Sequence, residues 1–301
     1  MDLELTKALA AWGLESADAK LVRHYDNLVY KAKTENKTYA LRICSPKTTQ
    51  PQLKAEIDWL IALRRDTNLI VPKPTPNKQG NFISQLDDKY CVLYEWLEGE
   101  PVSQTMSSKV ARQIGEMMAT LHLHAADYSS DRQAVNCYDR HYFFGINSWW
   151  QTKAKERLLD NYEKIIPAIE KAECLINRLS KSSEQFGMIH SDLHFSNIIS
   201  DREKYAIIDF GDCGMGYYLM DLAVTEAEFK DYGDAKQLIT VFRESYQNRR
   251  GCSPPSQDIR IFEVMSSLLW LEWIFESKSE QVREDKARWL NPIIQAIRET
   301  V

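Results

Sequence analysis

The sequence has no excess of positive charge. It contains 38 lysine and arginine residues against 43 aspartate and glutamate residues, which gives a net charge of -5. The basic residues are scattered and form no stripe that could release counterions from a nucleic acid. Long apolar runs are also missing, because the most apolar stretch, MSSLLWLEWIF, is interrupted by Glu272. We therefore expect neither a nucleic-acid partner nor a membrane span.

Cysteine pairs and a basic leader are missing as well. The six cysteines form neither a C-x-x-C pair nor a cluster with metal-ligand spacing; they stand at positions 44, 91, 137, 174, 213 and 252. Reduced thiols in the core are the expected state. The N-terminal segment MDLELTKALAAWGLESADAK carries Asp2 and Glu4 where a signal peptide would be basic. These features predict a cytoplasmic protein.

The first third of the chain is rich in strand patterns. With 301 residues and 44% hydrophobic residues, the chain can form one large or two modest domains. Alternating runs over residues 20–43 predict antiparallel strands, and NFISQL and KYCVLYEW predict two more. Between them, an apolar stripe at helical spacing predicts a helix; it comprises Leu53, Ile57, Leu60 and Ile61. Glu56 lies at the edge of this stripe, where a carboxylate needs a partner.

After Trp96 the pattern changes. The segment LEGEPVSQ is typical of a linker, and helical patterns follow near residues 110–121, 148–180, 219–247 and 257–299. This change predicts a strand-rich lobe of residues 1–96 and a larger helical lobe of residues 97–301. Clefts between such lobes commonly hold ligands.

One stretch, MIHSDLHFSNIISDREKYAIIDFGD, combines a predicted hairpin with polar residues that cores normally exclude. His190, Asp192 and Asn197 have the spacing H-x-D-x-x-x-x-N, and Asp209 follows the second strand in the sequence D-F-G. Magnesium prefers oxygen ligands, which suits Asn197 and Asp209 at adjoining strand ends. Asp192 is placed to accept or orient the proton of an attacking hydroxyl. The stretch therefore predicts two metal ligands and one general base.

The strand-rich lobe offers a positively charged side chain for the nucleotide phosphates and a binding place for the adenine ring. Arg42 lies in YALRI, and an inward Glu56 on the next helix is expected to pair with it and aim it at nucleotide phosphates. The segment Glu95, Trp96 and Leu97 follows the last strand, where an adenine can pair with backbone groups. Any strand that joins two lobes offers such groups, so this assignment is less specific than the motif.

Six segments occur in the order RHYDNLVYKA, YALRI, VLYEWLEG, MATLHLHA, IHSDLHFSNII and IIDFGDCGMGYYLMDLA. In this order the chain resembles the protein-kinase-like superfamily over nearly its whole length. It is most similar to the branch of aminoglycoside phosphotransferases, choline kinases and type II homoserine kinases. The resemblance implies an α+β, two-lobed kinase-like fold with a small antiparallel-sheet N-lobe and a larger, mainly helical C-lobe. It also implies ATP, Mg²⁺ and transfer of the γ-phosphoryl group to a hydroxyl of a small molecule.

The resemblance also assigns roles by position. Asp192 resembles the catalytic base, while Asn197 and Asp209 resemble the metal ligands. Arg42 and Glu56 resemble the ion pair that anchors the phosphates. Arginine takes the place of the usual lysine here, as it does in choline kinase-like relatives.

Other positions extend or depart from the pattern. Asp221 resembles the branch's buried aspartate that braces the catalytic loop. Protein kinases have H-R-D, whereas Ser191 stands in the arginine position, so no phosphorylation switch is expected. Only GDCGMGYYLM separates Phe210 from Asp221, which is too short for a protein-docking segment.

The turn RHYDNLVYKA has no glycine, which predicts looser closure over phosphates. The alternatives are a protein kinase and a non-catalytic nucleotide-binding regulatory module.

The acceptor site is expected in the helical lobe. One hypothesis is an aromatic box for an ammonium group, helped by Glu272 or Glu276 and built from Trp149, Trp150, Trp270 and Trp273. Ordinary helix packing of these rings is favoured over the box. If the box is present, the acceptor is expected to be an amine-bearing metabolite. An aminoglycoside-like compound is the other acceptor that the sequence allows.

Three further polar residues of the motif receive less specific expectations. His190 is expected to brace the loop. His194 could touch the substrate or a phosphate, but a solvent-facing position is favoured. Asp212 is expected either to reach a second metal or the acceptor, or to cap a turn.

Overall fold

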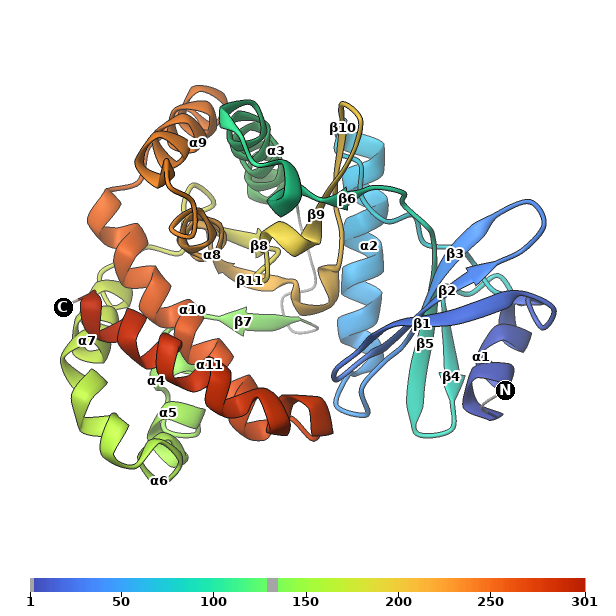
Figure 1. The fold of residues 1–301 in the computed structure, drawn as a ribbon, viewed down its shortest axis with the longest axis horizontal. Coiled ribbons are helices and arrows are strands. Elements are labelled where there is room, and N and C mark those ends of the chain that lie inside the picture. The colour runs from blue at the N-terminus through green and yellow to red at the C-terminus, as the bar shows by residue number, and fades with distance from the viewer. Residues whose placement is uncertain (1–2, 129–134, 301) are drawn as a thin grey trace.

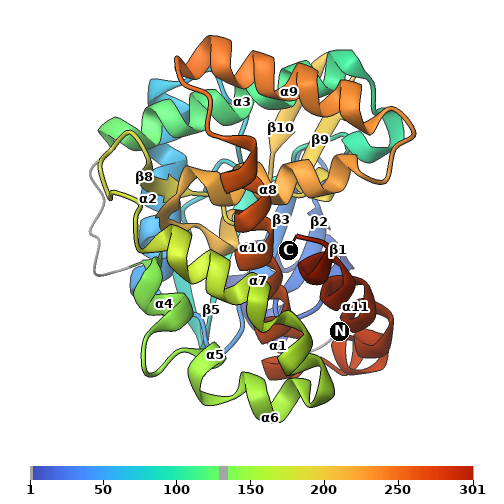
Figure 2. The ribbon, with the colours of Figure 1, turned by 90° about the vertical axis from the view of Figure 1, so that its left-hand side faces the viewer.

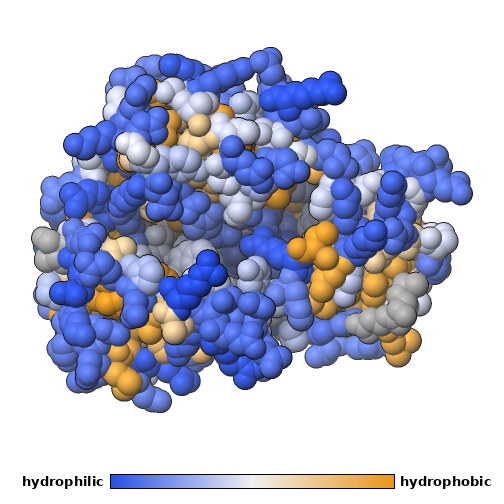
Figure 3. All heavy atoms as spheres, in the orientation of Figure 1, coloured by the Kyte–Doolittle hydropathy of each residue, from blue (hydrophilic) through white to orange (hydrophobic). Residues whose placement is uncertain are grey.

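The computed structural model describes residues 3–128 and 135–300. A five-stranded antiparallel sheet forms one part of the molecule and a mainly helical assembly forms the other, with one helix, α2, between them (Figure 1). This arrangement confirms the α+β, two-lobed fold class. The face in Figure 3 is mostly hydrophilic, with hydrophobic residues in separate small patches, and it is hollowed between the two parts.

The five strands have the order β1-β2-β3-β5-β4, and each neighbouring pair is antiparallel. They are β1 (Asp18–His24), β2 (Leu28–Lys33), β3 (Thr38–Ile43), β4 (Ile83–Leu86) and β5 (Lys89–Glu95). Helix α1 (Leu3–Trp12) contributes Leu5 and Leu9 to a small core with Leu41 and Leu93 of the sheet. The strands confirm the sequence prediction, whereas α1 was not predicted.

Helix α2 (Gln50–Asp66) begins with a capping box in which Thr49 and Gln52 satisfy each other's backbone amides. Its buried face includes Leu53, Ile57 and Leu60, as predicted, and it joins the larger core with residues of the helical part. Ile61 is 38% exposed, so its assignment to the apolar stripe was wrong. Glu56 is only 3% exposed despite its charge.

The predicted helical region of residues 110–121 lies within one helix, α3 (Ser108–Asp127), but the other three predicted regions are interrupted in the structure. Residues 148–180 contain α5 (Trp149–Thr152), α6 (Ala154–Leu158) and α7 (Asp160–Ile176), with Leu159 between the last two at a φ of 51°. The other regions split into the pairs α8 (Tyr218–Phe229) with α9 (Ala235–Arg250), and α10 (Ser256–Glu276) with α11 (Glu280–Glu299). Periodicity predicted these helices but not the short connections that redirect them.

Helices α3 (Ser108–Asp127) and α9 run side by side, as the perpendicular view shows (Figure 2). Gly115 permits their close approach, because a Cβ atom there would lie 2.4 Å from the Phe242 carbonyl oxygen. A short helix, α4 (Arg140–Phe144), precedes α5. Among the described residues, no helix has the length and apolarity needed to cross a bilayer.

Two small sheets hold the loops of the predicted motif. The hairpin β9 (Ile198–Asp201) and β10 (Lys204–Ile207) confirms the predicted pair of strands, and β6 (Glu100–Pro101) extends it. The second sheet has the order β7-β11-β8 and consists of β7 (Asn136–Tyr138), β8 (Phe186–Ile189) and β11 (Gly214–Tyr217). The predicted linker LEGEPVSQ therefore contains a strand, β6, and a 3₁₀ turn, Val102–Thr105.

The cysteines form no disulfide among the described residues. Cys44, Cys91 and Cys213 are buried, as expected for core thiols, but Cys174 and Cys252 are exposed. The expectation of buried thiols therefore holds only in part.

Candidate active site

The loop after β8 depends on one buried carboxylate. Asp221, at the start of α8, is fully buried and accepts the backbone amides of His190 and Ser191 at 2.9 Å and 2.7 Å. These bonds stabilise Ser191 in the left-handed region at a φ of 70°, a conformation that non-glycine residues adopt at a cost. His122 of α3 lies 3.1 Å from the same carboxylate. The brace expected from Asp221 is confirmed, while the part of His122 was not predicted.

His190 and Phe210 fasten the two arms of the motif to each other. His190 is fully buried, its Nε2 lies 2.9 Å from the Ile208 carbonyl oxygen, and its Nδ1 lies 3.3 Å from the Asp192 amide. The Phe210 ring packs 4.7 Å from the His190 ring and 5.4 Å from the Trp59 ring of α2. His190 is therefore the loop brace that the sequence predicted.

Asn197 and Asp192 are in direct contact. The Asn197 side-chain nitrogen donates to the Asp192 carbonyl oxygen at 2.8 Å and to its carboxylate at 2.9 Å. The Asn197 carbonyl oxygen is then the side-chain atom that remains to bind a cation. The Ile208 amide donates to the Asn197 backbone carbonyl at 2.9 Å, which sets Asn197 beside the residue that precedes Asp209. Both predicted metal ligands therefore lie at the same end of the hairpin.

Three carboxylates crowd this end of the hairpin. Asp209 has a φ of 62°, again in the left-handed region, and forms an ion pair with Arg23 of β1. The pKa of Asp212 is raised to about 7, first by burial and then by the negative charges of Asp192 and Asp209. Asp212 as a whole residue is nevertheless exposed, so solutes can reach it. The cluster favours a bound cation.

His194 faces a second carboxylate in addition to Asp192. Its two ring nitrogens lie 3.0 Å from Asp192 and 3.3 Å from Glu228 of α8. Burial disfavours the charged imidazole, but the two carboxylates outweigh burial and raise the pKa of His194 to about 10. Burial would likewise raise the pKa of Asp192, yet the His194 cation lowers it. The expectation that His194 faces solvent was wrong, because its two acidic neighbours hold it in the cleft.

The cation of the sheet reaches the same end of the hairpin. Arg42 is 5% exposed, and its Nη2 donates to Glu56 at 2.5 Å, which confirms the predicted ion pair. Tyr94 donates its hydroxyl to the same carboxylate at 2.7 Å. A Cβ atom on Gly211 would lie 3.1 Å from the Arg42 Nη1 and 3.5 Å from an Asp209 oxygen. Arg42 is therefore next to the D-F-G turn.

The arrangement fits a metal-bound nucleotide. The Arg42 Nε is buried without a hydrogen-bond partner in the described structure, so a donor is available for a phosphate oxygen. Within residues 3–128 and 135–300 no group of three or more His, Cys, Asp or Glu residues is arranged to hold a metal ion alone. A magnesium ion held by Asn197 and Asp209 would take its other ligands from phosphates and water, which is its usual mode of binding.

The predicted adenine segment is partly occupied by the sheet itself. The Glu95 amide donates to the Lys73 carbonyl at 2.9 Å, and the Trp96 amide donates to the Thr38 carbonyl at 3.0 Å. The Leu97 amide makes no backbone hydrogen bond to another described residue, so it is the donor of this segment that is left for a base. Adenine contacts at Glu95, Trp96 and Leu97 remain a prediction.

The four tryptophans of the hypothesised aromatic box lie in two separate environments and do not line one pocket. Trp149 and Trp150 are 7% and 8% exposed, and the cavity beside them has a volume of about 10 Å³, room for about one water molecule. An organic substrate that carries an ammonium group does not fit there. Trp270 packs against His194 at 5.3 Å and against Trp273 at 5.4 Å, so these two rings lie beside the carboxylate cluster.

The sequence reasoning missed Arg23 and Glu228. Neither belongs to a recognisable spacing: Arg23 lies 186 residues from Asp209, and Glu228 is one of several acidic residues in α8. Arg23 is the first residue of RHYDNLVYKA, the segment predicted to close over phosphates, and this position is the signal that could have pointed to it.

The fold and the site together define a two-lobed, protein-kinase-like protein. A family model described as the phosphotransferase enzyme family matches residues 18–254. The chain belongs to this family.

Individual relatives are more distant. Amicoumacin kinase of Bacillus subtilis (strain 168) is 24% identical over 232 residues, which are 73% of this chain and 66% of that protein. The match therefore spans slightly less than two thirds of the relative. A microcompartment-associated aminopropanol kinase has a TM-score of 0.80 at 20% identity, over 98% of this chain and 94% of that one. Amicoumacin kinase hAmiN, solved with AMP-PNP, Ca²⁺ and Ami, has a TM-score of 0.77 at 16% identity, over 99% and 92%.

We predict that Asp221→Ala lowers the free energy of unfolding by about 2–5 kcal/mol, because each buried amide left without an acceptor costs about 1–3 kcal/mol. Chemical denaturation measures the effect. Asp231→Ala, an exposed change two residues after the end of the same helix, is the control and should stay within about 0.5 kcal/mol of wild type. A loss below about 1 kcal/mol for Asp221→Ala would show that the loop holds its shape without the brace.

Proposed function

We propose that the protein is an ATP-dependent kinase that transfers the γ-phosphoryl group of MgATP to a hydroxyl of a small, amine-bearing metabolite. The observation that carries the proposal is the meeting of three carboxylates with the Asn197 amide and the buried Arg42 at one end of the β9–β10 hairpin. Phosphoryl transfer depends mainly on positioning and on neutralising charge, and these groups supply both.

Each residue has a defined part in this proposal. Asp192 accepts a hydrogen bond from the acceptor hydroxyl and orients it toward the γ-phosphorus. Asn197 and Asp209 hold the divalent cation, which when bound neutralises charge on the phosphate oxygens. Arg42, fixed by Glu56, binds the phosphates.

The same proposal divides the chain. Residues 1–96 form the nucleotide-binding lobe, with adenine beside Glu95, Trp96 and Leu97, and residues 97–301 carry the catalytic loop and the acceptor site. Six cysteines without a disulfide among the described residues support a cytoplasmic setting.

A small acceptor is supported by the shortness of the segment after the D-F-G turn. Strand β11 and helix α8 follow Asp212 within a few residues, which leaves no segment for docking a protein substrate. The Glu228 carboxylate is already paired with His194, so the support for an amine on the acceptor comes from a protein of similar fold. The aminopropanol kinase with the same fold bears the name of an amino alcohol.

A coupled assay of ADP release over a panel of alcohols tests the proposal. The panel includes homoserine, choline, ethanolamine, hydroxylysine, methylthioribose, fructosamines and aminoglycosides, and unfolded proteins with labelled ATP form a separate arm. Release of ADP that depends on one of the small alcohols is expected. Label transfer to protein instead would indicate a protein kinase, and MgATP binding without turnover on any substrate would indicate a regulatory module.

We predict that Asp192→Asn leaves nucleotide affinity near the wild-type value and lowers turnover by ~100-fold or more, because a positioned general base contributes about that much. Turnover on the acceptor found in the panel and calorimetric nucleotide binding measure the two effects. Asp201→Asn, an exposed change at the end of β9, should leave both unchanged. Turnover like that of wild type in Asp192→Asn would remove Asp192 from the chemistry.

We also predict that Asp209→Ala weakens binding of the nucleotide in the presence of Mg²⁺ by ~10-fold to 100-fold, because one of two protein ligands to the cation is lost. The matched control is Asp201→Ala. Isothermal titration calorimetry with AMP-PNP, with and without Mg²⁺, measures the change. An unaltered affinity in the presence of Mg²⁺ would show that Asp209 binds no metal.

A further inference from the structure

Strand β1 contains an irregularity next to Arg23. Leu21 lies opposite Tyr30 of β2, but Arg23 lies opposite Val29, so β1 has one extra residue at Val22. Such a bulge redirects the side chains that follow it, and bulges are frequent beside active sites. Arg23 is therefore aimed by the backbone of the strand, not by a flexible loop.

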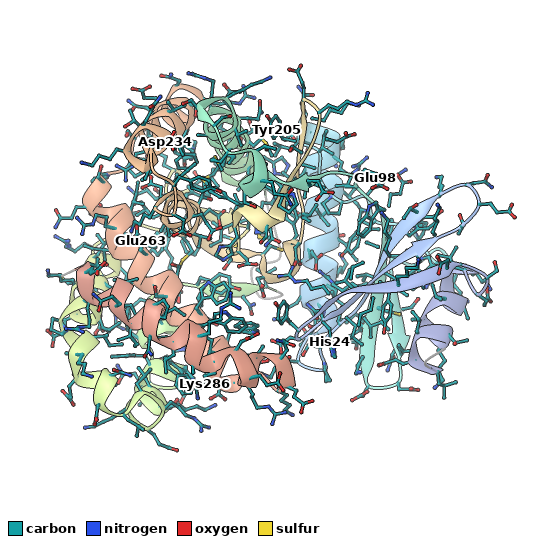
Figure 4. The ribbon with its side chains drawn as sticks, viewed as in Figure 1. His24, Glu98, Tyr205, Asp234, Glu263 and Lys286 are labelled. Atoms are coloured by element: carbon teal, nitrogen blue, oxygen red, sulfur yellow. The ribbon has the colours of Figure 1, made fainter. Side chains whose placement is uncertain are left out.

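The turn after Arg23 is fastened to the helical part by side chains. Asp26 accepts hydrogen bonds from the Trp273 indole at 2.7 Å and from the Ser277 hydroxyl at 2.8 Å, both in or just after α10. The Tyr25 ring meets the Trp273 ring edge-on at 6.0 Å. Figure 4 labels His24 where this hairpin reaches toward the helical part. The turn has no glycine, and these contacts fix its position in place of a glycine-rich backbone.

Arg23 reaches the carboxylate that the proposed function assigns to the metal. Its Nη1 pairs with the Asp209 Oδ2, and the two side chains are 42% and 28% exposed. An ion pair with that much exposure contributes little to stability. The contact instead places a positive charge where a divalent cation would bind Asp209.

We infer that Arg23 is a nucleotide-positioning residue that neutralises Asp209 while the cleft is empty and moves to the phosphate oxygens when the nucleotide and its divalent cation bind. This inference rests on the proposed function of the same site. It assigns to one side chain the phosphate contact that a glycine-rich turn makes with its backbone amides.

The exchange leaves no charge unpaired at either stage. In the empty cleft Arg23 offsets the Asp209 carboxylate, which is crowded by Asp192 and Asp212. After the cation takes this carboxylate, the guanidinium finds phosphate oxygens, to which its planar donors bind in pairs. The bulge and the Asp26 contacts keep the strand in place, so the side chain alone needs to move.

Binding measurements test the inference without turnover. The variants are Arg23→Ala, Arg23→Lys and the control Lys20→Ala, an exposed change on the same strand whose side chain is 76% exposed. Calorimetry is performed with Mn²⁺ alone and with AMP-PNP plus Mn²⁺. Thermal unfolding confirms that each variant is folded.

Arg23→Ala is expected to bind Mn²⁺ alone about two- to fivefold more tightly, because the competing cation is gone. It is expected to bind AMP-PNP with Mn²⁺ ~10-fold more weakly, because a charge-assisted contact with phosphate is lost. Arg23→Lys should lie between wild type and Arg23→Ala. Lys20→Ala should match wild type in both titrations.

Failure of either half of the expected result would overturn the inference. Unchanged Mn²⁺ affinity would mean that Arg23 does not compete for Asp209, and unchanged nucleotide affinity would mean that it does not move to the phosphates. Asp209→Ala separates this failure from failure of the proposed function. If Asp209→Ala abolishes Mn²⁺ binding while Arg23→Ala matches wild type, only the role assigned to Arg23 is wrong. If Asp209→Ala leaves Mn²⁺ binding intact, the assignment of the metal site is wrong.

Discussion

Repulsion among three carboxylates is the constraint on which the rest of this structure depends. Asp192, Asp209 and Asp212 lie close enough for their charges to interact, and burial of the Asp212 carboxyl, followed by the negative charges of Asp192 and Asp209, raises the pKa of Asp212 to about 7. Such a cluster is unfavourable unless a cation joins it. Arg23 and His194 supply positive charge from two sides, and in the proposed function a metal-bound nucleotide would complete the arrangement.

The fold holds this unfavourable cluster together with buried groups that bind no ligand. Asp221 accepts two backbone amides of the loop that carries Asp192, which offsets the left-handed conformation of Ser191. On the other side, Glu56 and Tyr94 fix Arg42 in an environment where an unpaired guanidinium would be costly. The Asp221 hydrogen bonds and the Arg42 contacts each join distant parts of the chain, so the stability of the fold and the geometry of the site are coupled.

Local patterns in the sequence predicted those contacts of the site whose residues belong to one motif or to one helix and the strand before it. The spacing of Asp192 and Asn197 fixes their contact within a single loop, and the inward glutamate on α2 predicted its arginine partner. The contacts of Arg23 and Glu228 depend on a bulge and on the docking of α8, which no local pattern encodes. The helix breaks were missed for the same reason, because periodicity continues across short connections.

The most direct test of the account is the position of the metal in a crystal grown with AMP-PNP and Mn²⁺. The account predicts an anomalous peak of Mn²⁺ between the Asn197 carbonyl oxygen and the Asp209 carboxylate, with phosphate oxygens completing the coordination. An ordered nucleotide whose metal lies away from both residues, or a cleft that binds nucleotide without any metal peak, would contradict it.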